Sequence, residues 1–265
     1  VGATQHGILG AVLAEGETVL ENCACEPEIQ WLCRYMRSMG AKIQGDGTSE
    51  IRIQGVKSLS AGCIQVPPDR IVSGTYICAA AITRSQIVLE NPPEGELKAF
   101  LEVYRKMGGQ YKGNSGKLLV NGKNVQSPVK LLETGVYPGF PTDMQPQMSV
   151  LLASAHGTSI ITESFWDSRF RYVEELRRMG AQFSLDGKLA VIEGVDHLNA
   201  APVKATDLRA GAAVVIAALC AKGVSQIEEI RHIERGYEDI VEKLQKLGAD
   251  IKRIHTPEDT QPKAM

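Results

Sequence analysis

The phrase Leu176-Arg177-Arg178-Met179-Gly180-Ala181 closes an amphipathic run of residues, and shorter versions of it recur along the chain. Basic residues in a last turn followed by glycine are typical of a helix C-terminus, so each copy predicts the end of a helix. The copies come about 70 residues apart, which indicates a repeated folding unit. They read Met39-Gly40-Ala41, Met107-Gly108-Gly109, Met179-Gly180-Ala181 and Leu247-Gly248-Ala249, and they end helices predicted over 29–38, 97–106, 170–178 and 240–246.

The sequence on both sides of each copy follows one order. A short strand follows the phrase, as at 42–44 and 182–184, and in three copies a polar turn leads to a second strand. An earlier helix of small residues precedes each copy and is followed by a β-rich run. The second strands are predicted over 50–54, 117–120 and 189–193, the early helices over 4–14, 72–82, 145–155 and 208–221, and leading strands over 63–66, 129–132 and 203–205.

These elements predict an α/β (α+β) fold built from repeated βαβαββ units. The early helices are rich in alanine and glycine, so we expect them to be buried in close packing. The later helices should expose one face. The first copy lacks its leading strand, and Val66-Pro67-Pro68 interrupts regular structure. We therefore predict that residues 1–66 are the last unit of one domain, that residues 67–255 form a second domain of three units, and that residues 256–265 are a tail.

Composition narrows the function classes. The net charge of −2 and the 43% hydrophobic content are ordinary for a globular protein and offer no broad basic surface for nucleic acid. The longest apolar run, 210–221, is too short to span a membrane, and no signal-peptide pattern is present. Six cysteines without a C-x-x-C pair indicate reduced thiols and a cytoplasmic protein. The five histidines lack ligand spacing, so we expect no metal.

The starts of the early helices carry the candidate site residues. They read Pro68-Asp69-Arg70, Pro141-Thr142-Asp143 and Asp207-Leu208-Arg209. The aspartates could be N-caps, which satisfy free N–H groups at a helix start. Alternatively, units packed around an axis would gather several helix N-termini and arginines at one end, where they would bind a phosphate or carboxylate. Arg70, Arg209 and Arg235 lie at or near such starts.

Asp143 follows a stiff loop, Pro138-Gly139-Phe140-Pro141, that should fix its approach. A rigidly held carboxylate can act as a general base toward a substrate hydroxyl, but a capping role is equally compatible with the sequence.

Three strings make the chain resemble a known family. They are Phe140-Pro141-Thr142-Asp143-Met144-Gln145, Ala205-Thr206-Asp207-Leu208-Arg209-Ala210 and His232-Ile233-Glu234-Arg235-Gly236-Tyr237. They are similar to hallmarks of the UDP-N-acetylglucosamine 1-carboxyvinyltransferase family of enolpyruvyl transferases. The resemblance implies an inside-out α/β barrel of two domains with three units each. It also implies transfer of the enolpyruvyl group of phosphoenolpyruvate to the 3-hydroxyl of UDP-N-acetylglucosamine, with release of phosphate, as an early step toward bacterial peptidoglycan, without metal or cofactor.

The same resemblance assigns roles to individual residues. Asp143 matches the residue that contacts the sugar hydroxyl and is a candidate base, and Arg235 is a second catalytic candidate. Phe165, Val1 and Gly2 match positions that contact the sugar nucleotide. Asp207, Arg209 and Arg235 match charged residues around phosphoenolpyruvate, and Arg70 joins them as a substrate-binding candidate from its place at a helix start.

The sequence also departs from the family pattern. The proton-donating cysteine and an early Lys-Asn pair of the family would lie upstream of Val1, and Trp166-Asp167-Ser168-Arg169 stands where an aromatic-Glu-Asn-Arg run is usual. We therefore predict that residues 1–265 alone do not turn over substrate and that the chain needs an N-terminal portion of the same enzyme as partner. The alternative is a non-catalytic fragment that binds a nucleotide sugar or docks a partner.

Overall fold

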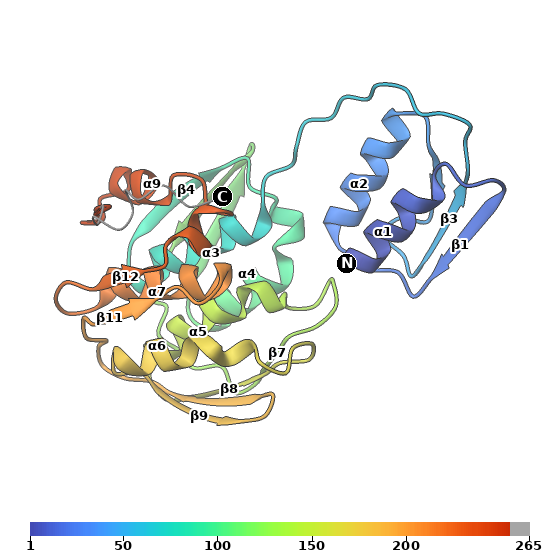
Figure 1. Ribbon diagram of the computed structural model, residues 1–265. Coiled ribbons are helices and arrows are strands. Elements are labelled where there is room, and N and C mark those ends of the chain that lie inside the picture. The colour runs from blue at the N-terminus through green and yellow to red at the C-terminus, as the bar shows by residue number, and fades with distance from the viewer. Residues whose placement is uncertain (255–265) are drawn as a thin grey trace, which may run out of the picture.

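The computed structural model describes residues 1–254, so the predicted tail 256–265 lies outside the described residues. Two lobes lie side by side in Figure 1 and are joined by the extended segment 55–69. Each lobe has its own cluster of buried apolar side chains. The first lobe is one unit, made of α1 (Gly2–Ala11), β1 (Glu17–Glu21), α2 (Pro27–Ser38), β2 (Lys42–Gln44) and β3 (Glu50–Gln54).

The second lobe holds three further units. The first has α3 (Arg70–Ile82), β4 (Gln86–Glu90), α4 (Lys98–Lys106), β5 (Gln110–Asn114) and β6 (Lys117–Asn121). The next has β7 (Leu132–Glu133), the 3₁₀ turn η2 (Thr142–Met144), α5 (Gln145–Ala153), β8 (Thr158–Thr162), η3 (Arg169–Tyr172), α6 (Val173–Arg178), β9 (Gln182–Asp186) and β10 (Leu189–Glu193). The last has β11 (Pro202–Lys204), α7 (Leu208–Cys220), β12 (Gln226–Glu228), α8 (Arg231–Glu234) and α9 (Ile240–Lys246).

Strand pairing repeats from unit to unit. The sheets run β1-β3-β2, β4-β6-β5 and β7-β8-β10-β9, so in each the last strand of the unit lies between its two antiparallel partners. The parallel pairs β7-β8 and β11-β12 add the leading strands of the third and fourth units. The repeats predicted from the sequence are therefore present as matching sheets.

Glycines mark two equivalent positions in the units. Gly40, Gly108, Gly180 and Gly248 follow the outer helices with φ near +101°, +101°, +90° and +97°, the left-handed conformation that glycine adopts at a helix C-terminus. Gly55 and Gly194 follow the last strand of their units, where an added Cβ would overlap the carbonyl oxygens of Ala14 and Ala155. The sheet therefore approaches the end of the small-residue helix at a distance that only glycine permits.

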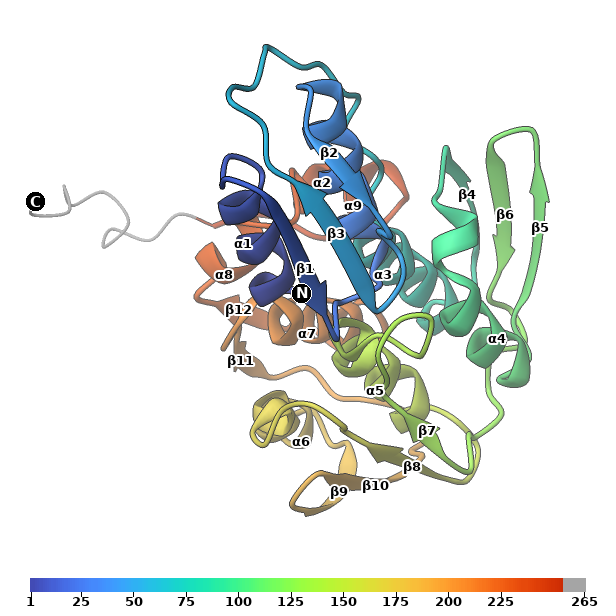
Figure 2. The same ribbon diagram turned by 90° about the vertical axis from the view of Figure 1, so that its right-hand side faces the viewer.

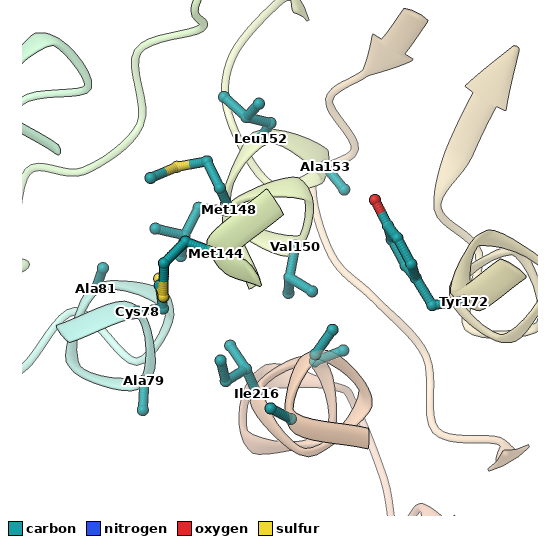
Figure 3. Packing of buried hydrophobic residues seen from close by; sticks show 14 of the residues in the cluster. Cys78, Ala79, Ala81, Met144, Met148, Val150, Leu152, Ala153, Tyr172 and Ile216 are labelled. Carbon is teal, nitrogen blue, oxygen red and sulfur yellow. The ribbon is translucent and has the colours of Figure 1, made fainter. Parts of the chain in front are cut away.

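The three small-residue helices α3, α5 and α7 contact one another at the centre of the second lobe. Figure 3 shows Cys78 of α3, Val150 of α5 and Ile216 of α7 directed into the space between them. The sheets and the amphipathic helices lie outside this trio, as Figure 2 shows from the side. Alanine and glycine allow the close helix contacts, and burial of the apolar surface stabilises the arrangement.

Three predictions about elements were wrong. A strand was expected after every copy of the phrase, but none follows Leu247-Gly248-Ala249 within residues 249–254, where the second strand that pairs with it in the other units is also missing. The helix α1 was expected to be buried like its equivalents, but only Ile8 and Ala11 of it are buried, because the first lobe as described offers it no second or third small-residue helix. No strand forms at 63–66. That segment crosses between the lobes, Val66 is 82% exposed, and Pro67 and Pro68 offer no N–H for a ladder.

Few polar contacts join the lobes. Arg70 of α3 donates to Glu28 of α2 at 2.9 Å, and the indole of Trp31 donates to Glu96 at 3.3 Å. Within residues 1–254, no helix combines the length and the apolar character that crossing a bilayer requires. The division at residue 66 remains a prediction of the sequence.

Candidate active site

Equivalent aspartates begin the three central helices, but the structure uses them differently. Asp69 accepts hydrogen bonds from the backbone N–H groups of Ile71 and Val72, and Asp207 accepts from those of Arg209 and Ala210. Both are therefore N-caps, the first of the two alternatives that the sequence left open.

Asp143 is different because the extra turn η2 precedes α5. Its carboxylate accepts no backbone N–H in η2 or α5 and instead lies between two guanidinium groups. Arg209 Nη2 lies 2.9 Å from Oδ2, and Arg169 Nη2 lies 2.7 Å from Oδ1. The loop before η2 is fixed by Phe140, which is buried and packs against Phe100. Asp143 is therefore not a cap but the carboxylate of a charged cluster.

This cluster borders a cavity of about 370 Å³, which we call the arginine cavity. Arg169 and Arg209 are in ion pairs with Asp143, whereas within residues 1–254 Arg171 and Arg235 are in none. The surplus of guanidinium groups favours an anionic ligand with phosphate or carboxylate oxygens. The lining residues are Asp143, Trp166, Ser168, Arg169, Arg171, Asp207, Leu208, Arg209 and Arg235.

Opposing effects set the charge of the central carboxyl. Burial alone would raise the pKa of Asp143, but the charges and hydrogen bonds of Arg209 and Arg169 outweigh burial and hold that pKa below its ordinary value. Asp143 is therefore a carboxylate at neutral pH. In this state it accepts hydrogen bonds readily but is a weak base, because a general base works best with a pKa near the working pH.

A buried polar network lies behind Arg209. Thr75 Oγ1 of α3 donates to the carbonyl of Ile71 and lies 2.9 Å from the Tyr237 hydroxyl, so Tyr237 donates to Thr75. Gln147 of α5 donates to Thr75 Oγ1 at 3.1 Å and to the Tyr237 oxygen at 3.4 Å. Burial raises the pKa of Tyr237, and the charge of Arg209 on α7 opposes this effect, so the network extends to the neighbourhood of Arg209.

The other predicted site residues lie apart from this cluster. Phe165 neighbours the lining residue Trp166 but does not line the cavity and is 42% exposed. The buried guanidinium of Arg70 pairs with Glu28, and Val1 and Gly2 lie exposed at the start of α1 in the other lobe. None of these four borders the arginine cavity, so their contacts with a substrate remain predictions.

The sequence interpretation missed Arg169 as a site residue. It lies 26 residues from Asp143, in the run that departs from the family pattern, and nothing in its local spacing indicates that it reaches the aspartate. The one indication in the sequence was that the run 166–169 still ends in arginine, as the family pattern does. The substituted Asp167 is 93% exposed on its side chain and pairs with Lys188, away from Asp143.

The cysteines and metal-binding residue types give no second site. All six thiols are free, and none lines the arginine cavity. Among residues 1–254, no group of three or more His, Cys, Asp or Glu side chains is arranged to hold a metal ion.

Comparisons with known proteins identify the family. A family model described as EPSP synthase (3-phosphoshikimate 1-carboxyvinyltransferase) matches residues 1–244. The chain belongs to this family. Its sequence is 47% identical over 255 residues to UDP-N-acetylglucosamine 1-carboxyvinyltransferase 2 of Clostridium tetani, covering 96% of this chain and 61% of the relative. It is 48% identical over 256 residues to UDP-N-acetylglucosamine 1-carboxyvinyltransferase of Halothermothrix orenii, with the same two coverages.

The solved structures agree with the family assignment. The enolpyruvyl transferase NikO from Streptomyces tendae matches with a TM-score of 0.84 at 28% identity, over 95% of this chain and 60% of that one. The predicted fold class, the inside-out α/β barrel of the enolpyruvyl transferases, is confirmed, as is the resemblance to the carboxyvinyltransferases. The chain spans about 60% of the length of the relatives that it matches.

Proposed function

We propose that the chain is part of an enzyme that transfers the enolpyruvyl group of phosphoenolpyruvate to the 3-hydroxyl of UDP-N-acetylglucosamine. The observation that carries the proposal is Asp143, held between Arg209 and Arg169 at the edge of a cavity that also presents Arg171 and Arg235. Relatives at 47% and 48% identity bear the name of this activity, which supports the choice of substrate. The same proposal includes a cytoplasmic location and a role in peptidoglycan synthesis, in cell-wall biogenesis and in maintaining cell shape.

The reaction needs the two kinds of group that the cavity offers. In the first stage, C3 of phosphoenolpyruvate gains a proton, the sugar 3-hydroxyl oxygen bonds to C2, and the hydroxyl proton passes to a base. In the second stage, the C2–O bond to phosphate breaks and C3 loses a proton. Asp143 accepts the hydroxyl proton or hydrogen bond in this scheme, and the arginines balance the phosphate and carboxylate charges.

Binding of the anionic substrate would also change Asp143. Phosphate or carboxylate oxygens compete for the guanidinium groups of Arg209 and Arg169, which are the groups that lower the Asp143 pKa. Sharing these groups with the substrate raises the pKa and makes Asp143 a stronger base when the hydroxyl is in place. The family resemblance implies a cysteine as the proton donor to C3, and none of the six cysteines of this chain borders the arginine cavity.

The exposed face of α1 suits the N-terminal portion that is expected as a partner. The three equivalents of α1 bury one another, whereas Leu9 of α1 and Leu13, just after it, are exposed at 49% and 57%. Small-residue helices from further units of the same type would cover this face.

Mixing experiments test the proposal. We expect the chain to bind UDP-N-acetylglucosamine measurably in calorimetry. Phosphate should be released from phosphoenolpyruvate, in the presence of UDP-N-acetylglucosamine, only after the chain is mixed with a separately made N-terminal portion of a full-length family member. Asp143→Asn in that mixture should lower turnover by about 100-fold or more while nucleotide-sugar affinity changes by less than about tenfold. Binding without any turnover in the mixture would favour the alternative, a non-catalytic nucleotide-sugar-binding fragment. No binding and no turnover would refute the proposal.

A further inference from the structure

Glu163 is a buried carboxylate next to the arginine cavity but not part of its lining. It follows β8 directly and is 1% exposed. Its Oε1 accepts from the backbone N–H groups of Phe165 at 3.0 Å and Trp166 at 3.4 Å, and its Oε2 accepts from the Thr142 hydroxyl at 2.9 Å. Within residues 1–254 it is in no ion pair with a basic side chain, so neutral donors alone satisfy its oxygens.

These hydrogen bonds join two segments of the candidate site that are far apart in the sequence. One is the loop 164–168, which carries Phe165 and Trp166, and the other is η2, which carries Asp143 next to Thr142. Arg169 makes a second connection, because its Nη2 donates to the Thr142 carbonyl at 3.1 Å as well as to Asp143. Hydrogen bonds therefore join η2 to residues at both ends of the loop.

The presence of a charged residue at the buried position 163 indicates a role beyond stability. Burial of a carboxylate without a cation is unfavourable compared with burial of a neutral group, so stability alone would favour a different side chain. A carboxylate, however, supplies two acceptor oxygens in a fixed plane and forms stronger hydrogen bonds than a neutral acceptor.

We propose that Glu163 is a positioning residue that sets the loop 164–168 and Arg169 against Asp143. The part of the proposal that concerns substrate rests on the proposed function. The part that concerns the loop stands on the hydrogen bonds alone.

Variants separate positioning from plain stability. Glu163→Ala removes the hydrogen bonds of Glu163 to the loop and to η2 and leaves those of Arg169 in place, whereas Thr142→Val removes only the bond from Glu163 to η2. Glu163→Gln keeps both bonds, because its amide oxygen accepts from the loop while its NH₂ donates to Thr142 Oγ1. Glu175→Ala is the matched control. Glu175 is a second buried glutamate that accepts a backbone N–H, from Lys204 at 2.9 Å, but it lies on α6 and does not border the cavity.

Trp166 provides a readout that needs no substrate. In a Trp31→Phe background it is the single tryptophan of the chain, and its quenching by acrylamide reports how freely the loop moves. We expect Glu163→Ala to raise the quenching constant about twofold or more and Glu163→Gln to restore the parent value. Calorimetry with UDP-N-acetylglucosamine should show about tenfold weaker binding for Glu163→Ala, as expected for lost hydrogen bonds to a charged group.

The outcomes decide the two proposals separately. A folded Glu163→Ala variant whose quenching and affinity equal those of Glu175→Ala overturns the positioning role. If Glu163→Ala fails to fold by circular dichroism, Thr142→Val decides, with raised quenching supporting the role and unchanged quenching overturning it. If the Trp31→Phe parent itself does not bind UDP-N-acetylglucosamine, this result counts against the proposed function, while the quenching data still test the role of Glu163.

Discussion

Asp143 occupies a position at which its two equivalents, Asp69 and Asp207, cap helices. Asp143 lies inside the turn η2, which precedes α5, and not at the N-cap of a helix, so its carboxylate is free to accept from Arg169 and Arg209. A single added turn thus converts a structural position into a candidate catalytic one, since a capping carboxylate has its oxygens occupied by N–H groups.

The lowered pKa of Asp143 predicts a pH-dependent contribution to stability. Its pKa in the folded protein lies below the unfolded value of about 3.9, so the stabilisation is fully present above that value and is lost as pH falls through the lower folded value. Asp143→Asn cannot titrate, and at neutral pH it should melt at a lower temperature than the parent. The difference should shrink below about pH 4. Thermal melts from pH 7 to 2.5 measure it, with the exposed Asp186→Asn as control, and a constant difference would contradict the prediction.

Two buried tyrosines offer a matched test of the network behind Arg209. The Tyr237 hydroxyl makes hydrogen bonds with Thr75 and Gln147, whereas the buried Tyr104 hydroxyl has no partner among residues 1–254. Tyr237→Phe should lower the free energy of unfolding by about 1–3 kcal/mol, because both buried hydrogen bonds are lost. Tyr104→Phe should leave it unchanged or raise it slightly. Urea denaturation compares the two, and equal effects would show that the network contributes nothing.

At the scale of single residues, part of the site could be predicted from the sequence. Asp143, Asp207, Arg209 and Arg235 were expected at one end of packed units, and all four border the arginine cavity. Arg169 could not be predicted, because its approach to Asp143 depends on how the loop after β8 folds back onto η2, a contact between segments with no shared pattern. Arg70 sits at a helix start as its equivalents suggest, yet its guanidinium contacts Glu28 of the other lobe.

The elements were easier to predict than the contacts of single residues. The sequence patterns gave α9, β2, β3 and β10 with the observed bounds, and the other predicted helices to within a few residues, because glycine and basic residues mark helix ends. The short helix α8 was not predicted. The burial of α1 and the strand at 63–66 were wrong for one reason. Both predictions extended the repeat to places where the described chain has no neighbouring element to complete it.

The glycines after the last strand of each unit predict a position-specific effect. Gly194→Ala places a Cβ against the carbonyl oxygen of Ala155, so the strand or helix must shift, at a cost of about 1–3 kcal/mol in unfolding free energy. Gly95→Ala is the control, since an added Cβ there meets no atom within 4 Å, and it should change stability by less than about 0.5 kcal/mol. Chemical denaturation of both variants would contradict the prediction if they were equally stable.

On the scale of the whole molecule, the two lobes have separate cores and few polar contacts. The joining segment 55–69 has neither helix nor strand, and Lys57 on it is exposed. Trypsin should therefore make its first cut among residues 1–250 at the Lys57–Ser58 bond, giving a fragment of residues 1–57 that mass spectrometry identifies. Lys57→Gln should slow this cut strongly. A first cut inside either lobe would count against the division predicted near residue 66.

The position of α3, α5 and α7 also determines how solvent reaches the molecule. Sheets that form the middle layer of many α/β proteins are here the outer layer, and the helices take the place farthest from water. In heavy water, the peptide hydrogens of these three helices should therefore be the last to be replaced by deuterium, after those of every β-strand around them.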